Sequence, residues 1–174
     1  GIPCSPPPWG TLAAVDLDTG RLAWEVPLGH LPDGHPLMEL AGKRPIGLAN
    51  GGGPIVTAGG LVFIGATFDQ RIRAFDLATG AEVWQFKLPF PGIATPMSYV
   101  ADDGRQFVVI AAGGHGKAGL AVGATMVVAG RLDLEGDTIV TTVRAVRLDD
   151  GRLLPEVIDR RPLADLFAIP PAIA

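Results

Sequence analysis

The sequence has 174 residues, of which 48% are hydrophobic, and a formal net charge of −4. A chain of this length and apolar content can bury a core, which excludes a disordered acidic segment. Its 14 Lys and Arg residues are scattered along the chain, so nucleic acid is not an expected partner. Abundant glycine and proline, 24 and 16 residues, favour a turn-rich sheet protein over a helical bundle.

The first part of the chain predicts one hairpin and one long loop. A proline-rich loop leads into a hairpin over about residues 10–28, in which Gly20 supplies the positive φ that a tight turn needs. Residues 29–53 carry scattered prolines and glycines with little periodicity and are predicted as a loop. A connection of that length in a compact domain is often functional.

The following strands form groups. Four short apolar runs, separated by turns, predict a four-stranded blade over 55–58, 61–66, 71–76 and 82–88. Two more strands are expected at 97–101 and 106–112. Three alternating runs then follow at 124–134, 138–148 and 152–158. We therefore treat residues 1–117 as one unit and residues 118–174 as a divergent β-rich extension or a final blade.

An internal repeat relates two of these hairpins. The stretch from Ala14 to Leu28 recurs from Ala74 to Leu88 without a gap, matching the pairs Asp16 and Asp76, Thr19 and Thr79, Gly20 and Gly80, and Trp24 and Trp84. Self-similarity at a period of several tens of residues is typical of propellers and solenoids. The two aspartates are predicted to be turn residues, and the two tryptophans are predicted to pack between neighbouring sheets.

Five motifs carry a resemblance to a known family. They are GIPCSPPPWGTL from Gly1, AVDLDTG from Ala14, GGPIVTAGGLVFIGAT from Gly52, ATPM from Ala94 and QFVVIAAGGHG from Gln106. The segment up to about Gly116 resembles the carboxy-terminal part of membrane-associated dehydrogenases that depend on pyrroloquinoline quinone (PQQ), of the glucose, quinate and shikimate type.

The resemblance implies an all-β fold: two to three four-stranded blades of an eight-bladed quinoprotein propeller, with an extra β-hairpin extension at the C-terminus. It implies PQQ and calcium or another divalent cation as cofactors, a sugar or polyol substrate, and ubiquinone as electron acceptor. The full-length protein is expected to be periplasmic and membrane-associated. Catalytic residues and most cation ligands are expected in upstream propeller blades of the same protein, so this polypeptide alone is expected to be inactive.

The same resemblance implies a small set of site residues in this chain. Asn50, Gly51, Gly52 and Asp69 are expected to bind the cofactor, and His115 is expected near the substrate entrance. An Asn amide can hold a quinone oxygen, and glycines let the backbone approach a ligand closely. The alternative roles are those of turn residues for Asn50 and Asp69. No catalytic residue and no metal ligand is assigned within the chain.

Two other functions fit the repeat. A non-enzymatic propeller scaffold of the cell envelope would share the Asp-x-x-Thr-Gly-x-x-x-Trp pattern without binding quinone, but it would not need the motif around Cys4 or the one around His115. Alternatively, residues 118–174 have a binding role of their own, and limited proteolysis near Lys117 would then release a protected C-terminal piece.

Overall fold

The computed structural model describes residues 4–31, 35, 46–114 and 126–162. Within these ranges every regular element is a strand. The strands are β1 (Thr11–Val15), β2 (Leu22–Pro27), β3 (Ile55–Val56), β4 (Leu61–Ile64), β5 (Arg71–Asp76), β6 (Glu82–Lys87), β7 (Met97–Val100), β8 (Gln106–Ala112), β9 (Met126–Glu135), β10 (Thr138–Arg147) and β11 (Val157–Pro162). In this part of the chain no helix is long and apolar enough to cross a membrane.

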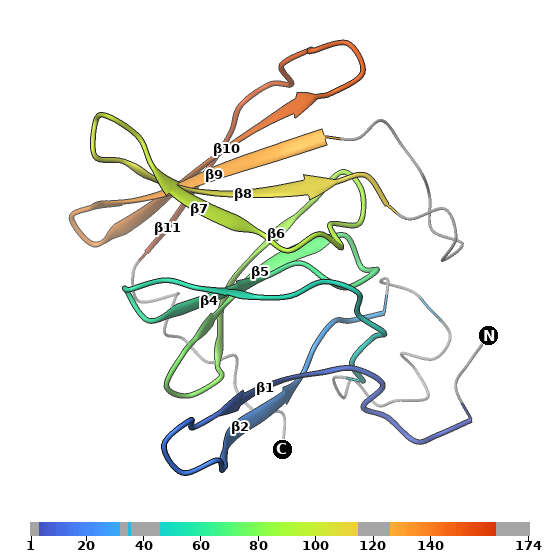
Figure 1. Cartoon of the computed structure of the whole chain (residues 1–174). Coiled ribbons are helices and arrows are strands. Elements are labelled where there is room, and N and C mark those ends of the chain that lie inside the picture. Colours follow the sequence, from blue (N-terminus) through green and yellow to red (C-terminus); the bar gives the residue numbers. More distant parts are fainter. Residues whose placement is uncertain (1–3, 32–34, 36–45, 115–125, 163–174) are drawn as a thin grey trace.

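Three antiparallel sheets follow one another in chain order (Figure 1). The first sheet is the β1–β2 hairpin, the second is the β3-β4-β5-β6 meander, and the third runs in the order β7-β8-β9-β10-β11. No sheet closes into a barrel among the described strands. The predicted all-β fold and partial propeller are confirmed, because separate meanders stacked along the chain are the units of such a ring.

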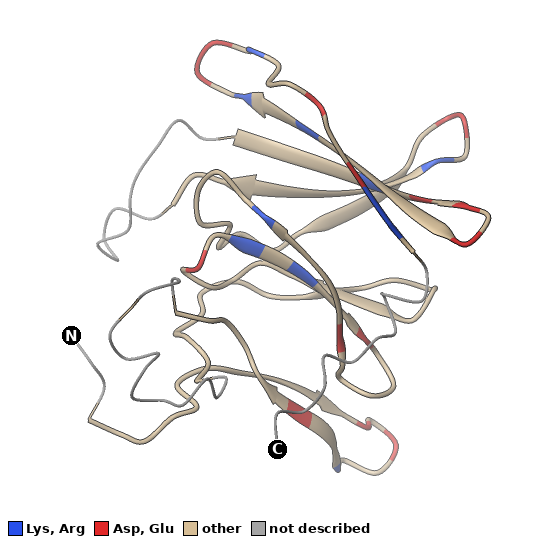
Figure 2. Cartoon of the chain, turned by 180° about the vertical axis from the view of Figure 1, so that it is seen from behind, with Lys and Arg blue, Asp and Glu red and all other residues tan. Residues whose placement is uncertain are grey.

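The third sheet has five strands where four-stranded blades were predicted. Strand β8 pairs with β9 in register from Val108 opposite Gly130 to Ala112 opposite Met126. The strands after residue 126 therefore extend the sheet that β7 and β8 begin. Many acidic residues lie at the hairpin turns rather than along the strands (Figure 2).

The last strand is displaced from its predicted position at 152–158. A single bridge joins Leu153 to Val146, and the ladder with β10 resumes only at Val157. Pro155 lies between the two pairings. A proline has no N–H to donate to a ladder, so it interrupts the strand and shifts its start toward the C-terminus.

The repeated turns are held by their aspartates, which confirms their structural role. Asp16 Oδ1 accepts the Thr19 N–H at 2.8 Å, and Asp76 Oδ1 accepts the Thr79 N–H at 2.8 Å. Each turn closes with a further backbone bond, in which Gly20 or Gly80 donates to the aspartate carbonyl. Both carboxylates thus accept hydrogen bonds from the turn that follows them, as in Asx turns.

Trp24 joins the first sheet to the second. Its indole Nε1 donates to the Leu77 carbonyl oxygen at 2.8 Å. Its ring lies against Gly80, where an added Cβ would approach the ring atoms to 2.7 Å. The predicted packing role of Trp24 between sheets is therefore confirmed, and the glycine of the second repeat serves two purposes, a positive φ of +73° and room for the ring.

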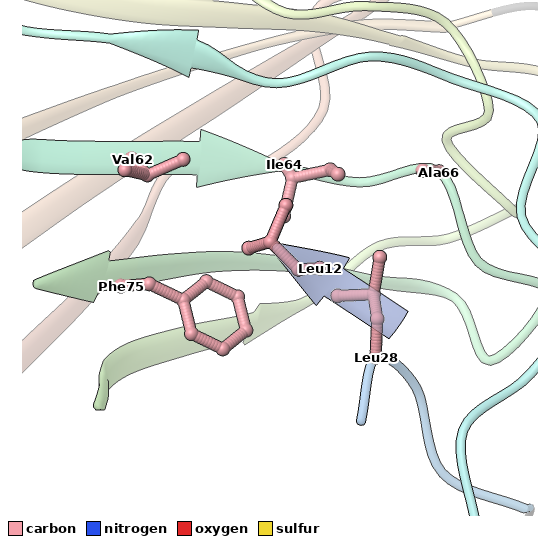
Figure 3. Packing of buried hydrophobic residues seen from close by; sticks show 6 residues of the cluster. All are labelled: Leu12, Leu28, Val62, Ile64, Ala66 and Phe75. Atoms are coloured by element: carbon pink, nitrogen blue, oxygen red, sulfur yellow. The ribbon is translucent and has the colours of Figure 1, made fainter. Parts of the chain in front are cut away.

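Two apolar cores lie between the sheets. The core between the first and second sheets is shown in Figure 3 and consists of Leu12, Leu28, Val62, Ile64, Ala66 and Phe75. The core between the second and third sheets consists of Ile72, Leu88, Ile110, Ala112, Val128 and Val143, with Trp84 and Phe86 packed against it. The second sheet thus buries one face against the first sheet and the other against the third, as strand alternation allows.

Gly80 and its repeat partner Gly20 offer a matched test of the tryptophan contact. Both have a positive φ, but an added Cβ at Gly20 meets nothing within 4 Å. Gly20→Ala should cost about 1–2 kcal/mol, which is the backbone penalty alone. Gly80→Ala should cost more in chemical denaturation, because the Trp24 ring must also move, and its near-ultraviolet circular dichroism should change. Equal losses for the two variants would contradict this assignment.

Candidate functional site

Asn50 and Gly51 lie exposed on a segment beside the second sheet. Asn50 forms an isolated antiparallel bridge with Thr67, and the Gly51 N–H donates to the Ala66 carbonyl oxygen at 3.0 Å. An added Cβ at Gly51 would meet nothing within 4 Å, whereas one at Gly52 would lie 2.5 Å from the Ile93 carbonyl oxygen. Residues 50–52, which we name the Asn50 segment, therefore combine open space at Gly51 with tight backbone packing at Gly52.

The partner of the Asn50 segment is a turn with unusual backbone angles. Ala66 and Gln70 have φ values of +57° and +59°, in the left-handed region that residues other than glycine seldom adopt. Ala66 is fully buried, and its N–H donates to the Gly92 carbonyl oxygen at 2.8 Å. Strained backbone of this kind persists only where its surroundings hold it.

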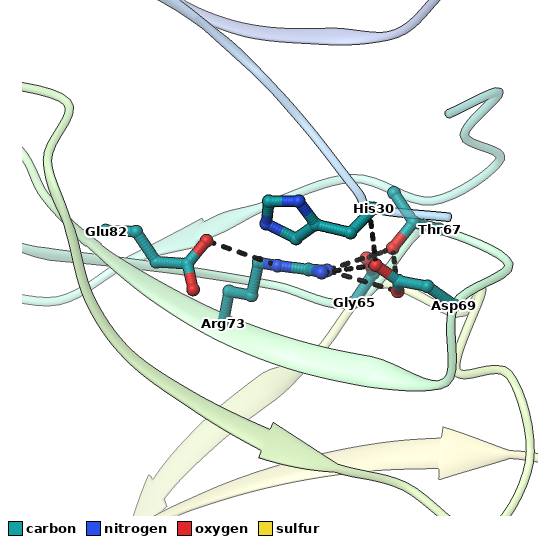
Figure 4. Close-up of polar contacts among 6 residues, drawn as sticks. All are labelled: His30, Gly65, Thr67, Asp69, Arg73 and Glu82. Atoms are coloured by element: carbon teal, nitrogen blue, oxygen red, sulfur yellow. Dashed lines mark hydrogen bonds and ion pairs between the residues drawn. The ribbon is translucent and has the colours of Figure 1, made fainter. Parts of the chain in front are cut away.

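Arg73, on β5, lies beneath this turn with its side chain fully buried. Its guanidinium forms an ion pair with the Asp69 carboxylate through Nη2, and Nη1 donates to Asp69 Oδ1 at 3.2 Å and to Thr67 Oγ1 at 3.1 Å. On its other side Glu82 Oε2 lies 3.3 Å from Nε (Figure 4). The guanidinium therefore bridges the turn to β6.

The carboxylate oxygens of Asp69 accept further hydrogen bonds. Thr67 Oγ1 donates to Asp69 Oδ1 at 2.7 Å, and the His30 backbone N–H donates to Oδ2 at 2.9 Å. The side chain of Asp69 is 1% exposed. We name His30, Thr67, Asp69, Arg73 and Glu82 the Arg73 cluster; it joins the end of the first sheet to the turn of the second.

The pKa values of the two carboxylates in the Arg73 cluster are shifted in opposite directions. Burial alone would raise the pKa of Asp69, but hydrogen bonds and charge attraction from Arg73, with Thr67 and the His30 N–H, lower that pKa below its ordinary value. Burial raises the pKa of Glu82, and Arg73 offsets this only in part. Asp69 thus favours its charged form and is the stronger counter-ion of Arg73, and Glu82 is the weaker one.

The structure brings four of the five predicted site residues into one neighbourhood. Asn50, Gly51 and Gly52 follow one another beside the turn that carries Asp69, and Thr67 connects the two groups. His115 lies outside the described residues. Within the described ranges no group of three or more His, Cys, Asp or Glu side chains could hold a metal ion.

Only part of this neighbourhood fits a quinone. Asn50 is exposed and has an amide that can donate, and the open backbone at Gly51 allows a close approach to carbonyl oxygens. The Asp69 carboxylate already faces Arg73, Thr67 and His30. The predicted binding roles of Asn50, Gly51, Gly52 and Asp69 stay predictions.

Sequence reasoning missed Arg73 and Thr67. The available signal was an arginine in the middle of β5, between Ile72 and Ala74 and four residues after an aspartate. A charged residue in a buried strand is seldom unpaired. The pattern therefore indicated an ion pair, although not its partners across the turn.

A cavity of about 200 Å³ lies elsewhere, between the second and third sheets. Its lining includes Phe63, Trp84, Phe86, Val108 and Val128, and no member of the Arg73 cluster or the Asn50 segment. Trp84 is stacked on Phe86 and meets Phe63 edge-on. Trp84 also packs against the core between the second and third sheets, which confirms its predicted position between sheets.

Loss of the guanidinium should destabilise the protein strongly. Arg73→Met leaves a buried Asp69 charge without its partner, and such losses cost about 3–5 kcal/mol in unfolding free energy. Arg105→Met, which removes the half-exposed partner of Asp103, should change the unfolding free energy far less. Denaturant titration of both variants measures the difference, and a small loss for Arg73→Met would show that the buried pair is not needed for stability.

Glu82 should make stability depend on pH in the direction set by its raised pKa. The protonated Glu82 side chain contributes fully to the free energy of unfolding below the unfolded pKa, about 4.3. That contribution is lost as the pH rises through the raised pKa of Glu82 in the folded chain. Glu82→Gln removes this loss, so its stability relative to the unaltered chain should grow as the pH rises above the ordinary pKa of a glutamate. Glu25→Gln, at an exposed site on β2, controls for the removal of one negative charge. A difference that stays flat or shrinks would contradict the assignment.

Comparison with known proteins supplies the family. The model of the glucose/ethanol/alcohol dehydrogenase β-propeller domain, designated PQQ, matches residues 1–108. The chain is 47% identical over 116 residues to the quinate/shikimate dehydrogenase (quinone) of Acinetobacter baylyi, covering 66% of this chain and 14% of that protein.

Two further relatives act on other substrates, according to their names. Identity is 43% to quinoprotein glucose dehydrogenase A of Acinetobacter calcoaceticus, covering 71% of this chain and 15% of that protein. It is 45% to the glycerol dehydrogenase large subunit of Gluconobacter thailandicus, covering 66% and 16%. The chain thus spans between 14% and 16% of the length of these relatives.

The family match covers both repeats, the Asn50 segment and the Arg73 cluster. It agrees with the stacked antiparallel meanders of the structure and with the resemblance expected from the five motifs. The chain belongs to the PQQ family of glucose/ethanol/alcohol dehydrogenase β-propeller domains.

Proposed function

We propose that this chain forms part of a quinoprotein dehydrogenase that oxidises a sugar or polyol alcohol with PQQ and passes the electrons to ubiquinone. The observation that carries the proposal is the exposed Asn50 segment, with open space at Gly51, inside the region that matches the family. Relatives named for quinate, glucose and glycerol support a polyhydroxylated substrate without choosing among them.

The residues of this chain would bind and orient the cofactor. PQQ, when bound, supplies the two-electron acceptor for alcohol oxidation. The Asn50 amide would donate to a carbonyl oxygen, Gly51 would permit close backbone approach, and Gly52 would fix the segment against Ile93. In this proposal calcium or another divalent cation completes the site, with ligands mostly outside this chain, and His115 lies at the substrate entrance.

The proposal places the catalytic base in upstream blades of the same protein, in the periplasm and associated with the membrane. The small share of each relative that the chain spans supports the existence of such upstream blades. We also propose that residues 118–174 complete the last blade, which the pairing of β8 with β9 supports. A non-enzymatic scaffold is the second candidate; only the shared repeat favours it.

A chimera tests the proposal. Residues 1–116 of this chain would replace the matching segment of the Acinetobacter baylyi quinate/shikimate dehydrogenase. We expect the chimera to bind PQQ and to reduce a dye with quinate, whereas the 174-residue chain alone should show no turnover. A folded chimera that binds no PQQ would exclude the proposed function and favour the scaffold.

Gly51→Ala in the same chimera tests the position of the cofactor. The added Cβ meets nothing in this chain, so folding should be unchanged. If PQQ approaches here, the methyl group should weaken PQQ binding about tenfold, measured by fluorescence titration. Gly59→Ala, at another exposed glycine, where an added Cβ would lie 4.0 Å from Thr57 Oγ1, is the matched control and should leave PQQ binding unchanged. Identical affinities for both variants would move the cofactor away from Gly51.

A further inference from the structure

We infer that Arg73 is a positioning residue for the Asn50 segment: by holding Asp69 and Thr67, it fixes the backbone against which Asn50 and Gly51 lie. The inference deepens the proposed function and rests on it where PQQ is concerned. Arg73 belongs to none of the site residues expected from the sequence, and the contacts that follow assign it this role.

A series of contacts connects Arg73 to Asn50 through Asp69 and Thr67. Arg73 Nη1 donates to Asp69 Oδ1 at 3.2 Å and to Thr67 Oγ1 at 3.1 Å, and the Thr67 hydroxyl donates to Asp69 Oδ1 at 2.7 Å. Thr67 in turn is the bridge partner of Asn50. The part of this connection that precedes Asn50 is shielded from solvent. Thr67 and Arg73 are fully buried, and the Asp69 side chain is nearly so.

The backbone that carries these contacts needs to be held. Ala66 and Gln70, at the two ends of the turn, both have positive φ. Left-handed residues other than glycine persist where surrounding contacts over-determine them. The Ala66 carbonyl accepts the Gly51 N–H, so relaxation of Ala66 toward a common conformation would turn that carbonyl away from Gly51.

The cluster also fixes the other side of the Asn50 segment. The His30 N–H donates to Asp69 Oδ2 at 2.9 Å, and the Leu48 N–H donates to the Leu28 carbonyl oxygen at 2.7 Å. The chain therefore approaches Asn50 from a strand end that Asp69 also holds. One ion pair thus sets both neighbours of the Asn50 segment, the end of the first sheet and the turn of the second.

This arrangement gives Asp69 an indirect route to the cofactor. Its carboxylate oxygens accept from Arg73, Thr67 and His30, and its side chain is buried. A substitution at Asp69 or Arg73 would therefore act on cofactor binding by displacing Asn50 and Gly51. The two substitutions should act in the same direction, and the double variant should lose less than the sum of the two, because both remove the Arg73–Asp69 contact.

Hydrogen exchange on the 174-residue chain tests the inference without cofactor. In Arg73→Met, under conditions where the chain remains folded, the Gly51 amide should exchange at least tenfold faster, while the Gly60 amide, which donates to the Thr57 carbonyl oxygen in the same sheet, should change far less. Arg73→Lys, which retains the charge, should fall between. Equal acceleration at Gly51 and Gly60 would reveal only general destabilisation and would overturn the inference, as would an unchanged Gly51.

Cofactor affinity in the chimera supplies the second measurement. Arg73→Lys should raise the dissociation constant of PQQ about tenfold and leave turnover at saturating PQQ within about twofold, because the reacting groups are untouched. Arg105→Met is the control and should change neither value. Unchanged affinity in Arg73→Lys would overturn the cofactor part of the inference. If the unaltered chimera binds no PQQ, the proposed function fails, and the exchange experiment alone decides the positioning role.

Discussion

The buried ion pair between Arg73 and Asp69 is the constraint on which the second sheet and its surroundings depend. A guanidinium without solvent contact needs fixed acceptors, and Asp69 supplies two oxygens from a turn only four residues away. The turn that supplies them has an unusual backbone form, with Ala66 and Gln70 in the left-handed region. The exposed Asn50 segment is then built on the outside of the same turn.

A second contact connects the repeats. Trp24 donates from its indole to Leu77 and lies on Gly80, so the end of one hairpin covers the turn of the next. The corresponding turn in the first hairpin leaves Leu17 94% exposed, whereas Leu77 is 40% exposed. Similar local sequences thus have different surroundings, because the Trp24 ring lies on the second turn and an added Cβ at Gly20 in the first turn meets nothing within 4 Å.

The apolar cores between the sheets and the buried Arg73 cluster differ in how far their side chains can move. Apolar burial between sheets is tolerant, since Leu12, Leu28, Ile64 and their neighbours can adjust to small shifts. The Arg73 cluster is less tolerant, because a buried charge loses stability when its hydrogen-bond partners move away. A site that must present an amide and an open glycine in fixed positions gains from being joined to the second kind of contact.

The sequence by itself determined the all-β class, the strand positions from β1 to β10, the Asx turns at Asp16 and Asp76, and the family. Those features follow from alternation, turn chemistry and motifs, which are local along the chain. Tertiary structure alone decided the five-stranded third sheet, the late start of β11 after Pro155, and the union of His30, Thr67, Asp69, Arg73 and Glu82. Those features depend on which segments meet across sheets, and local patterns do not encode the partner of a buried charge or the register between distant strands.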